Sequence, residues 1–235
     1  MLIDLRATME GTWPPAQTQV IGPWLIREGQ GGGQRVMATS VCGDWQSADV
    51  TVAEAAMRTL GQPLIFVLHA GDEALDAELA ARGYQIVDPV VGYGAQIADL
   101  DISAPEAMTS FPHWPPMAIA AALWQDGGIG PERLAVMKRV AGPKTAILGR
   151  VNDRAAGVAF VAIHNRVAML HALEVAPSLR RHGLGHNLLR AAVQWARQTG
   201  ADRFSLVVAE AKGSARSLYV SLGLQVLGRY HYRRK

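Results

Sequence analysis

The chain has 235 residues, of which 49% are hydrophobic and 18% are charged. This composition excludes an intrinsically disordered chain, and the length corresponds to one large or two small domains. The formal net charge of +3 is too small to indicate a nucleic-acid-binding surface, which needs basic residues clustered on one face.

The only cysteine is Cys42, so the sequence excludes an internal disulfide and a zinc site built from paired cysteines. Near the start, Asp4, Arg6 and Glu10 interrupt the apolar stretch that a secretory signal would need. No apolar run is long enough to span a bilayer. We therefore expect a cytoplasmic protein with no membrane, nucleic-acid or metal partner.

The first hundred residues predict alternating strands and helices. Strands over 23–27 and 35–41 are expected to form a hairpin around the glycine-rich turn between them. The predicted elements that follow are a helix over 47–60 capped by Ser47 or Asp49, a buried strand over 63–68, a helix over 72–82 closed by Gly83, and one or two strands over 84–97. A proline-rich connector is expected over 99–116.

The second half begins with predicted helices over 117–125 and from Pro131 to Gly142. Three strand-like runs, 145–151, 156–164 and 167–175, are separated by tight turns and predict an antiparallel meander. The remaining predicted elements are a helix over 184–198 ended by Gly200, a strand over 204–209, a helix over 214–222 capped by Gly223, and a last strand over 224–233.

Two segments hint at an internal duplication. Residues 79–87 are similar to residues 219–227, each pairing a helix end with a glycine and a strand, and Trp13-Pro14-Pro15 echoes Trp114-Pro115-Pro116. The hypothesis is two related lobes, the first lacking the segment of turn and helix after the third strand of the meander. Chance matches of this length are common, so an unrelated accessory lobe is the alternative.

The most informative segment joins the strand ending at Val175 to the helix beginning at Leu184. Unsatisfied amides at a helix start attract an anion such as a pyrophosphate, and glycine allows close approach of the phosphates to the backbone. The segment matches neither the Walker phosphate loop nor the dinucleotide fingerprint. An ordinary tight strand-to-helix connection is the alternative reading.

The same segment resembles the acetyl-CoA loop of the GNAT N-acetyltransferase superfamily through Val175-x-Pro177 and Arg180-x-x-Gly183-x-Gly185. A second match follows in the expected order, with Ala215-Arg216-Ser217-Leu218-Tyr219 and Leu222-Gly223-Leu224. Leu170-His171-Ala172-Leu173-x-Val175 is also similar to the histidine-bearing strand of serotonin N-acetyltransferases. The resemblance covers residues 103–235.

The resemblance implies an α/β (α+β) fold, with a central mixed, mostly antiparallel sheet flanked by helices and a smaller N-terminal α/β lobe. Residues 103–235 would form the acetyl-CoA-dependent domain, and residues 1–102 a degenerate GNAT-like or accessory lobe. The implied activity is transfer of an acetyl group from acetyl-CoA to a primary amine of a small molecule or amino acid by direct attack, in a monomer or homodimer. Acetylation of a protein terminus or lysine, or non-catalytic acyl-CoA binding, are the alternatives.

The family motif also implies roles for individual residues. Tyr219 would protonate the departing thiolate. His171, with an ordinary pKa near 6.5, is the first candidate for the base and Glu174 the second, although a regular strand would place them on opposite faces unless a bulge intervenes. The residues implied in cofactor binding are Leu173, Glu174, Val175, Arg180, Arg181, His182, Gly183, Leu184, Gly185, His186 and Lys212.

Two further expectations concern specificity and a departure from the family. Trp124 and Asp126, near the end of the helix predicted over 117–125, are candidates for contact with the substrate, with core packing as the alternative for Trp124. Lys212 stands where the family often has an asparagine that contacts the pantetheine arm. That contact is therefore in doubt, and a lysine there would approach a phosphate instead.

Overall fold

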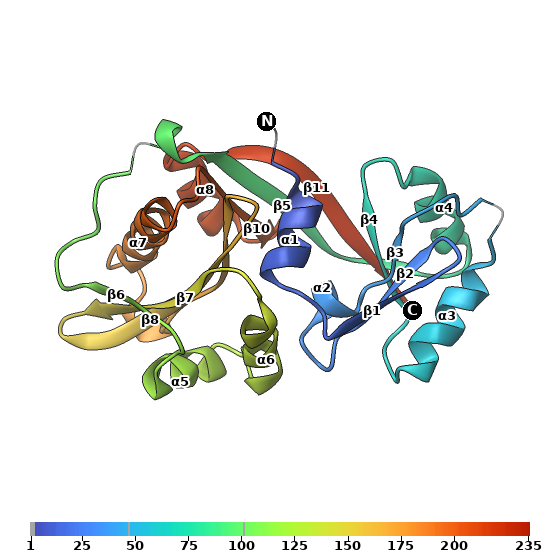
Figure 1. Cartoon of the computed structure of the whole chain (residues 1–235), viewed down its shortest axis with the longest axis horizontal. Coiled ribbons are helices and arrows are strands. Elements are labelled where there is room, and N and C mark those ends of the chain that lie inside the picture. The colour runs from blue at the N-terminus through green and yellow to red at the C-terminus, as the bar shows by residue number, and fades with distance from the viewer. Residues whose placement is uncertain (1–2, 47, 101) are drawn as a thin grey trace. The chain divides into compact units, whose positions relative to one another are not determined.

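The computed structural model describes residues 3–46, 48–100 and 102–235, which divide into two compact units (Figure 1). Unit 1 contains the described residues of Met1–Pro14, Gly92–Val208 and Lys212–Leu227. Unit 2 contains the described residues of Pro15–Val91, together with Ala209–Ala211 and Gly228–Lys235. Each unit combines segments that are distant in sequence. The prediction of two successive domains, 1–102 and 103–235, stays a prediction.

Unit 1 is a sheet covered by helices on both faces. Its elements are α1 (Leu5–Thr12), β6 (Ser110–His113), α5 (Ala118–Asp126), α6 (Pro131–Arg139), β7 (Lys144–Val151), β8 (Arg154–His164), β9 (Val167–Val175), α7 (Leu184–Gln198), most of β10 (Arg203–Ala209) and α8 (Gly213–Ser221), with short 3-10 turns at Ile97–Asp99 and Pro177–Leu179. Strands β7, β8 and β9 pair antiparallel in sequence order, which confirms the predicted meander.

Helix α7 lies on one face of β6–β8 and α5 on the other (Figure 1). Two glycines of the sheet explain how closely α7 packs. A side chain on Gly149 or Gly157 would come within 2.7–3.0 Å of Leu184, the first residue of α7. On the opposite face α1 contacts β8 and β9, and the ring of Trp13 packs edge-on against Phe160, with 6.0 Å between ring centroids.

Unit 2 contains a three-stranded sheet, further strands and three helices around their own core. Its elements are β1 (Gln17–Ile21), β2 (Trp24–Glu28), α2 (Gln34–Met37), β3 (Ser40–Val41), α3 (Val50–Thr59), β4 (Ile65–His69) and α4 (Glu73–Ala81). Its buried side chains include Trp24, Ile26, Val50, Met57, Phe66, Leu75, Leu79 and Tyr84. Of the two caps predicted for α3, Asp49 is confirmed, because its carboxylate accepts a hydrogen bond from the amide of Thr51. Ser47 lies outside the described residues.

Two long strands, β5 (Gln85–Gln96) and β11 (Gln225–Arg234), divide between the units. The larger sheet has the order β4-β11-β5-β10-β9-β8-β7-β6, and of the pairings described here only β9 with β10 is parallel among these eight strands. Residues Tyr230–Arg234 of β11 pair with β4 inside unit 2, whereas the end of β5 belongs to unit 1. The predicted mixed, mostly antiparallel sheet flanked by helices is therefore confirmed.

Three predictions about the elements need correction. Of the strand predicted over 35–41 only β3 forms, which pairs antiparallel with β2 as expected, because the left-handed backbone of Gly33, with φ of 98°, first leads into the helical turn α2. No element was predicted before Pro23, yet the structure contains both α1 and β1 there. The connector predicted over 99–116 contains the short strand β6, which pairs with β7.

No helix in the described part of the chain is both long enough and apolar enough to cross a membrane.

Candidate active site

Strand β9 carries a bulge, and it changes which side chains share a face. His171 is opposite Phe160 and Glu174 is opposite Val158, so three steps along β9 correspond to two steps along β8. The extra residue lies at Ala172, whose φ of 50° is unusual for a residue with a side chain. Phe160 and Val158 point to the same face of β8, and the bulge therefore brings His171 and Glu174 to one face of β9.

Helix α5 packs against this bulge through its last turn. The indole Nε1–H of Trp124 donates a hydrogen bond of 2.8 Å to the carbonyl oxygen of Ala172. One turn later, the backbone of Gly127 lies so close to Glu174 that a Cβ there would be 2.5 Å from the Cγ of Glu174 and 2.9 Å from its Cδ. The C-terminal turn of α5 thus fixes both the bulged carbonyl and the position of the Glu174 carboxylate.

His171 is buried and held by the N-terminal segment of unit 1. Its Nε2 is 2.9 Å from the hydroxyl oxygen of Thr12, and its ring lies 5.0 Å from that of Trp13. Since the Thr12 hydroxyl donates to the carbonyl of Thr8 at 2.6 Å, it accepts the hydrogen bond from His171. Nε2 of His171 therefore carries the hydrogen of this bond. His171 is 5% exposed, whereas Glu174 keeps 23% of its side-chain surface exposed.

Beyond the bulge, β9 separates from its parallel neighbour. The pairing of β9 with β10 covers Val167–Leu170 and Arg203–Leu206, and β9 continues for five residues after its last paired position. Residues 173–175 in that stretch are half-buried. A parallel pair that splays in this way leaves main-chain groups available to a ligand that enters between the strands.

The loop from β9 to α7 ends in a helix start that no side chain caps. Gly183 is the N-cap residue, its left-handed φ of 76° suits glycine, and no side chain bonds to the first amides of α7. Gly185 in the first turn has open space around its missing Cβ, where the nearest atom is a methyl of Leu218 at 3.6 Å. Leu218 precedes Tyr219, so the loop and the predicted proton donor come close together.

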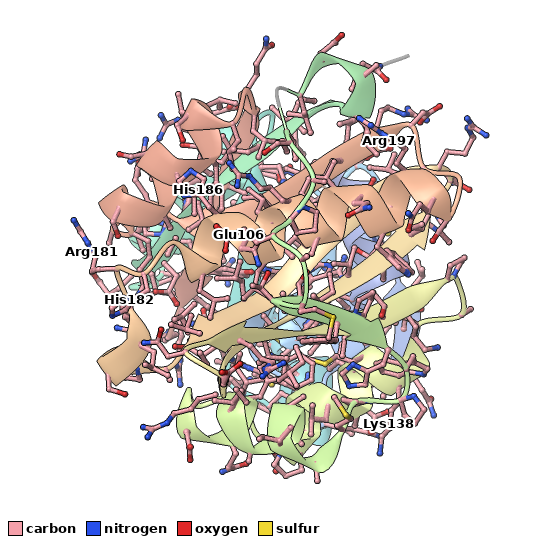
Figure 2. All side chains as sticks on the ribbon, turned by 90° about the vertical axis from the view of Figure 1, so that its left-hand side faces the viewer. Glu106, Lys138, Arg181, His182, His186 and Arg197 are labelled. Atoms are coloured by element: carbon pink, nitrogen blue, oxygen red, sulfur yellow. The ribbon has the colours of Figure 1, made fainter. Side chains whose placement is uncertain are left out.

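Basic and histidine side chains gather at this end of α7. Figure 2 shows Arg181, His182 and His186 at the N-terminal end of the helix and Arg197 at the other end. Arg181, His182 and His186 are exposed. Arg180 is already engaged, because its Nη2 bonds to the carboxylate of Glu174 at 3.0 Å and its Nε to the carbonyl of Val175 at 3.1 Å.

Tyr219 is buried in α8, with 7% of its surface exposed. Burial raises the pKa of its phenol to about 12, so the hydroxyl is protonated at neutral pH. Its ring lies 5.9 Å from that of Tyr93 on β5, and the Tyr93 hydroxyl accepts a hydrogen bond of 3.1 Å from Arg216. Among the described residues, none forms a hydrogen bond with the Tyr219 hydroxyl.

The remaining predicted site residues differ in how exposed they are. Lys212 is exposed at the N-cap of α8, and Asp126 is exposed at the end of α5. Trp124 has no exposed surface, which favours core packing, the alternative to the predicted substrate contact. The sequence analysis missed the roles of Thr12 and Trp13 at the site. The glycine break after α5 was visible in the sequence, but its partner was not.

No group of three or more His, Cys, Asp or Glu side chains in the described residues is arranged to hold a metal ion.

The comparisons with known proteins agree on one family. Residues 114–224 match the model of the acetyltransferase (GNAT) family. A curated relative, an uncharacterised N-acetyltransferase of Bacillus subtilis called YobR, is 26% identical over 95% of this chain and 94% of its own length.

Solved structures support the same fold. A GCN5-related N-acetyltransferase from Kribbella flavida superposes with a TM-score of 0.75 at 19% identity, covering 97% of this chain and 93% of that one. A tandem GNAT protein from the clavulanic acid biosynthesis pathway superposes with a TM-score of 0.63 at 16% identity, covering 94% of this chain and 84% of that one. With the bulged strand, the loop before α7 and the buried tyrosine of α8, these matches show that the chain belongs to the GNAT superfamily and is an acyltransferase of the N-acetyltransferase type.

Proposed function

We propose that the protein transfers the acetyl group of acetyl-CoA to a primary amine of a small molecule or amino acid by direct attack. The observation that carries this proposal is the combination, within unit 1, of the bulge at Ala172, the uncapped start of α7 and the buried Tyr219. The named activity of the relatives supports the reaction class.

The start of α7 suits the phosphates of the donor. The amides of Leu184, Gly185 and His186 form the first turn of a helix whose dipole favours negative charge, and the exposed Arg181 and His182 precede it. The space at Gly185 admits a phosphate or the pantetheine arm next to the backbone. Lys212 is the further cation proposed to approach the donor, and Arg180 shapes the wall of the site through Glu174.

Proton removal from the amine is assigned to Glu174. The attacking nitrogen must lose a proton as its bond to the thioester carbon forms, and the exposed part of the Glu174 carboxylate can accept it directly or through one water. His171 is the weaker candidate, because its Nε2 is committed to Thr12 and its ring is buried against Trp13. This revises the order of the two candidates expected from the sequence.

Two further groups complete the reaction. The negative charge that develops on the carbonyl oxygen would be stabilised by backbone amides of the splayed segment Leu173–Val175. When the carbon–sulfur bond breaks, the electron pair stays on sulfur, and the phenol of Tyr219 donates the proton that converts the thiolate to a thiol. A pKa of about 12 keeps this proton in place at neutral pH until the thiolate forms.

Acetylation of a protein terminus or lysine, and acyl-CoA binding without catalysis, are the competing functions. A panel of free amino acids, small amines and short peptides, scored by thiol release from acetyl-CoA, separates them. We expect small amines or amino acids to react and peptides to react poorly. Preferential turnover of peptides would overturn the acceptor class, and acetyl-CoA binding without turnover of any amine would indicate a binding module. Gly185→Leu is the control, because filling the space beside the helix start should abolish binding of acetyl-CoA in calorimetry.

We also propose that the two halves of the chain are related lobes. The segment β4-α4-β5 and the segment β10-α8-β11 share one offset of 140 positions: the helices begin at 73 and 213 and end at 81 and 221, and the strands after them begin at 85 and 225. Gly83 and Gly223, which close the helices, have φ values of 85° and 88°.

Side-chain contacts follow the same offset. In unit 1 Arg216 of α8 bonds to Tyr93 of β5, and in unit 2 Asp76 of α4 bonds to Arg233 of β11 at 2.7 Å. The two helix residues, Asp76 and Arg216, are 140 positions apart, and so are the two strand residues, Tyr93 and Arg233. The likeness to a tandem GNAT protein supports a duplicated ancestry. The sequence hypothesis assumed that the first lobe lacks the turn and helix that follow the third strand of the meander. In this comparison α3, which follows β3, corresponds to α7, which follows β9, so the first lobe does contain such a helix.

The corresponding loop of unit 2 is unsuited to phosphate. Residues 42–49 contain two aspartates and no basic residue, and the carboxylate of Asp49 already occupies the N-terminus of α3 by accepting the amide of Thr51. We therefore expect one acetyl-CoA per chain. Calorimetric titration giving two equivalent sites would contradict the assignment of a degenerate first lobe.

A further inference from the structure

The bulge of β9 depends on one hydrogen bond from another element. Ala172 and Leu173 together face Ala159 of β8, so the carbonyl of Ala172 is turned away from the regular ladder. The indole Nε1–H of Trp124 donates to that carbonyl at 2.8 Å. Because Trp124 has no exposed surface, water has no access to its indole ring in this conformation.

The conformation that this bond holds is unfavourable by itself. A residue with a side chain at a φ of 50° is strained and persists only where its surroundings impose it. A buried carbonyl without a donor would add a further cost. The hydrogen bond from Trp124 offsets both costs and selects this backbone at the point where β9 separates from β10.

The groups that follow Ala172 are those to which the proposed reaction assigns roles. The next peptide units carry the amides proposed to stabilise the oxyanion, and two residues further on Glu174 packs against the backbone of Gly127 in the same turn of α5. A rotation about Ala172 would move both groups together. Helix α5 thus contacts the bulged strand on each side of these groups, at Ala172 through Trp124 and at Glu174 through Gly127.

We propose that Trp124 is a positioning residue for acetyl transfer, whose indole N–H holds the Ala172 carbonyl and thereby orients the backbone amides of Leu173–Val175 and the Glu174 carboxylate. This inference rests on the proposed acetyl transfer. It differs from simple core packing in one respect: packing requires the aromatic volume of Trp124, whereas positioning requires its N–H group.

Trp124→Phe separates these two roles, because it keeps an aromatic ring and removes the donor. Trp195→Phe is the matched control, since the half-buried indole of Trp195 forms no hydrogen bond to another described residue. Each variant is assayed well below its melting temperature. We expect kcat of Trp124→Phe to fall about 10- to 100-fold, as for a misplaced reacting group, with the dissociation constant of desacetyl CoA within about twofold of the original.

Hydrogen exchange of the amides provides a readout that needs no activity. In Trp124→Phe the amides of Leu173 and Glu174 should exchange faster, while those of the distant helix α7 near Arg197 should not change. Unchanged exchange, an unchanged kcat, or an equal loss in Trp195→Phe would overturn the positioning role. If the original protein acetylates no amine, the proposed function fails, and the exchange experiment still decides whether Trp124 holds the bulge.

Ala172→Gly covers the case in which Trp124→Phe does not fold. Glycine adopts a φ of 50° without strain and leaves no cavity, so it loosens the bulge while the Trp124 indole stays in place. We expect a several-fold lower kcat with a melting temperature close to the original. A kcat equal to the original would show that the rigidity of the bulge does not affect the reaction.

Discussion

Gly127 controls the position of Glu174, and substituting it by alanine is the sharpest test of the proposed base. Gly127 has φ of −81° and ψ of 4°, a conformation that alanine adopts readily, so the substitution adds no backbone strain. The new Cβ would, however, stand 2.5 Å from the Cγ of Glu174. Carbon atoms in contact are normally about 3.5–4.0 Å apart, and Glu174 must therefore move by about 1 Å or more.

A displacement of this size is large for a proton acceptor. Misplacing a reacting group by about 1 Å can reduce the rate about 100-fold, equivalent to about 2.7 kcal/mol of transition-state stabilisation. We expect Gly127→Ala to lower kcat/KM for the amine about 10- to 100-fold. The melting temperature should be unchanged or slightly higher, because alanine restricts the unfolded chain more than glycine does.

The assay combines steady-state kinetics with thermal unfolding of the same preparation. Gly43→Ala is the control, because its Cβ would make only ordinary contacts with Pro23, at 3.6 and 3.7 Å. Retention of full activity in Gly127→Ala would refute the assignment of Glu174 as base. A large drop in melting temperature would instead refute the argument that the substitution acts on the side chain of Glu174 alone.

Three other predictions concern the buried tyrosines and the hydrogen bond between Thr12 and His171. Tyr219→Phe should lower kcat about 100-fold or more while calorimetry gives an unchanged affinity for acetyl-CoA, and a fully active variant would exclude Tyr219 as the proton donor. Thr12→Val removes the acceptor of the buried His171 hydrogen bond, so it should reduce the free energy of unfolding by about 1–3 kcal/mol and leave the pH–rate profile unchanged. A shifted profile would return the role of base to His171. The third prediction concerns alkaline unfolding. Burial raises the pKa of Tyr219 to about 12, and the pKa of Tyr84 and of Tyr232 is also raised mainly by burial. The unfolded chain therefore ionises first above pH 10, and stability should fall as the pH rises from 10 towards 12; circular dichroism showing constant stability over that range would contradict it.

Local signals in the sequence predicted much of the fold. The meander of β7–β9 follows from alternating apolar residues and tight turns, and the ends of α4 and α8 follow from Gly83 and Gly223, each of which has the positive φ that a helix C-cap uses. The loop before α7 was found from its glycines between a strand and a helix, and its role from its resemblance to the GNAT acetyl-CoA loop. These features depend on residues that are neighbours in the sequence.

The parts that were missed depend on contacts between distant residues. Trp124 is 48 positions from its acceptor at Ala172, and Thr12 is 159 positions from His171. The hydrophobic periodicity of a sequence does not indicate contacts between residues so far apart. The bulge was expected only as an exception to a regular strand, because nothing in the sequence around Ala172 requires a positive φ.

The division of β5 and β11 between the units has a consequence for biosynthesis. The neighbour of β4 in unit 2 is formed by Tyr230–Arg234, which are translated long after β4 itself. Domains usually fold on the ribosome in the order in which they emerge, the N-terminal one first. Here β4 lacks this neighbour until Tyr230–Arg234 have emerged, so this part of unit 2 is completed only after most of unit 1 has been made.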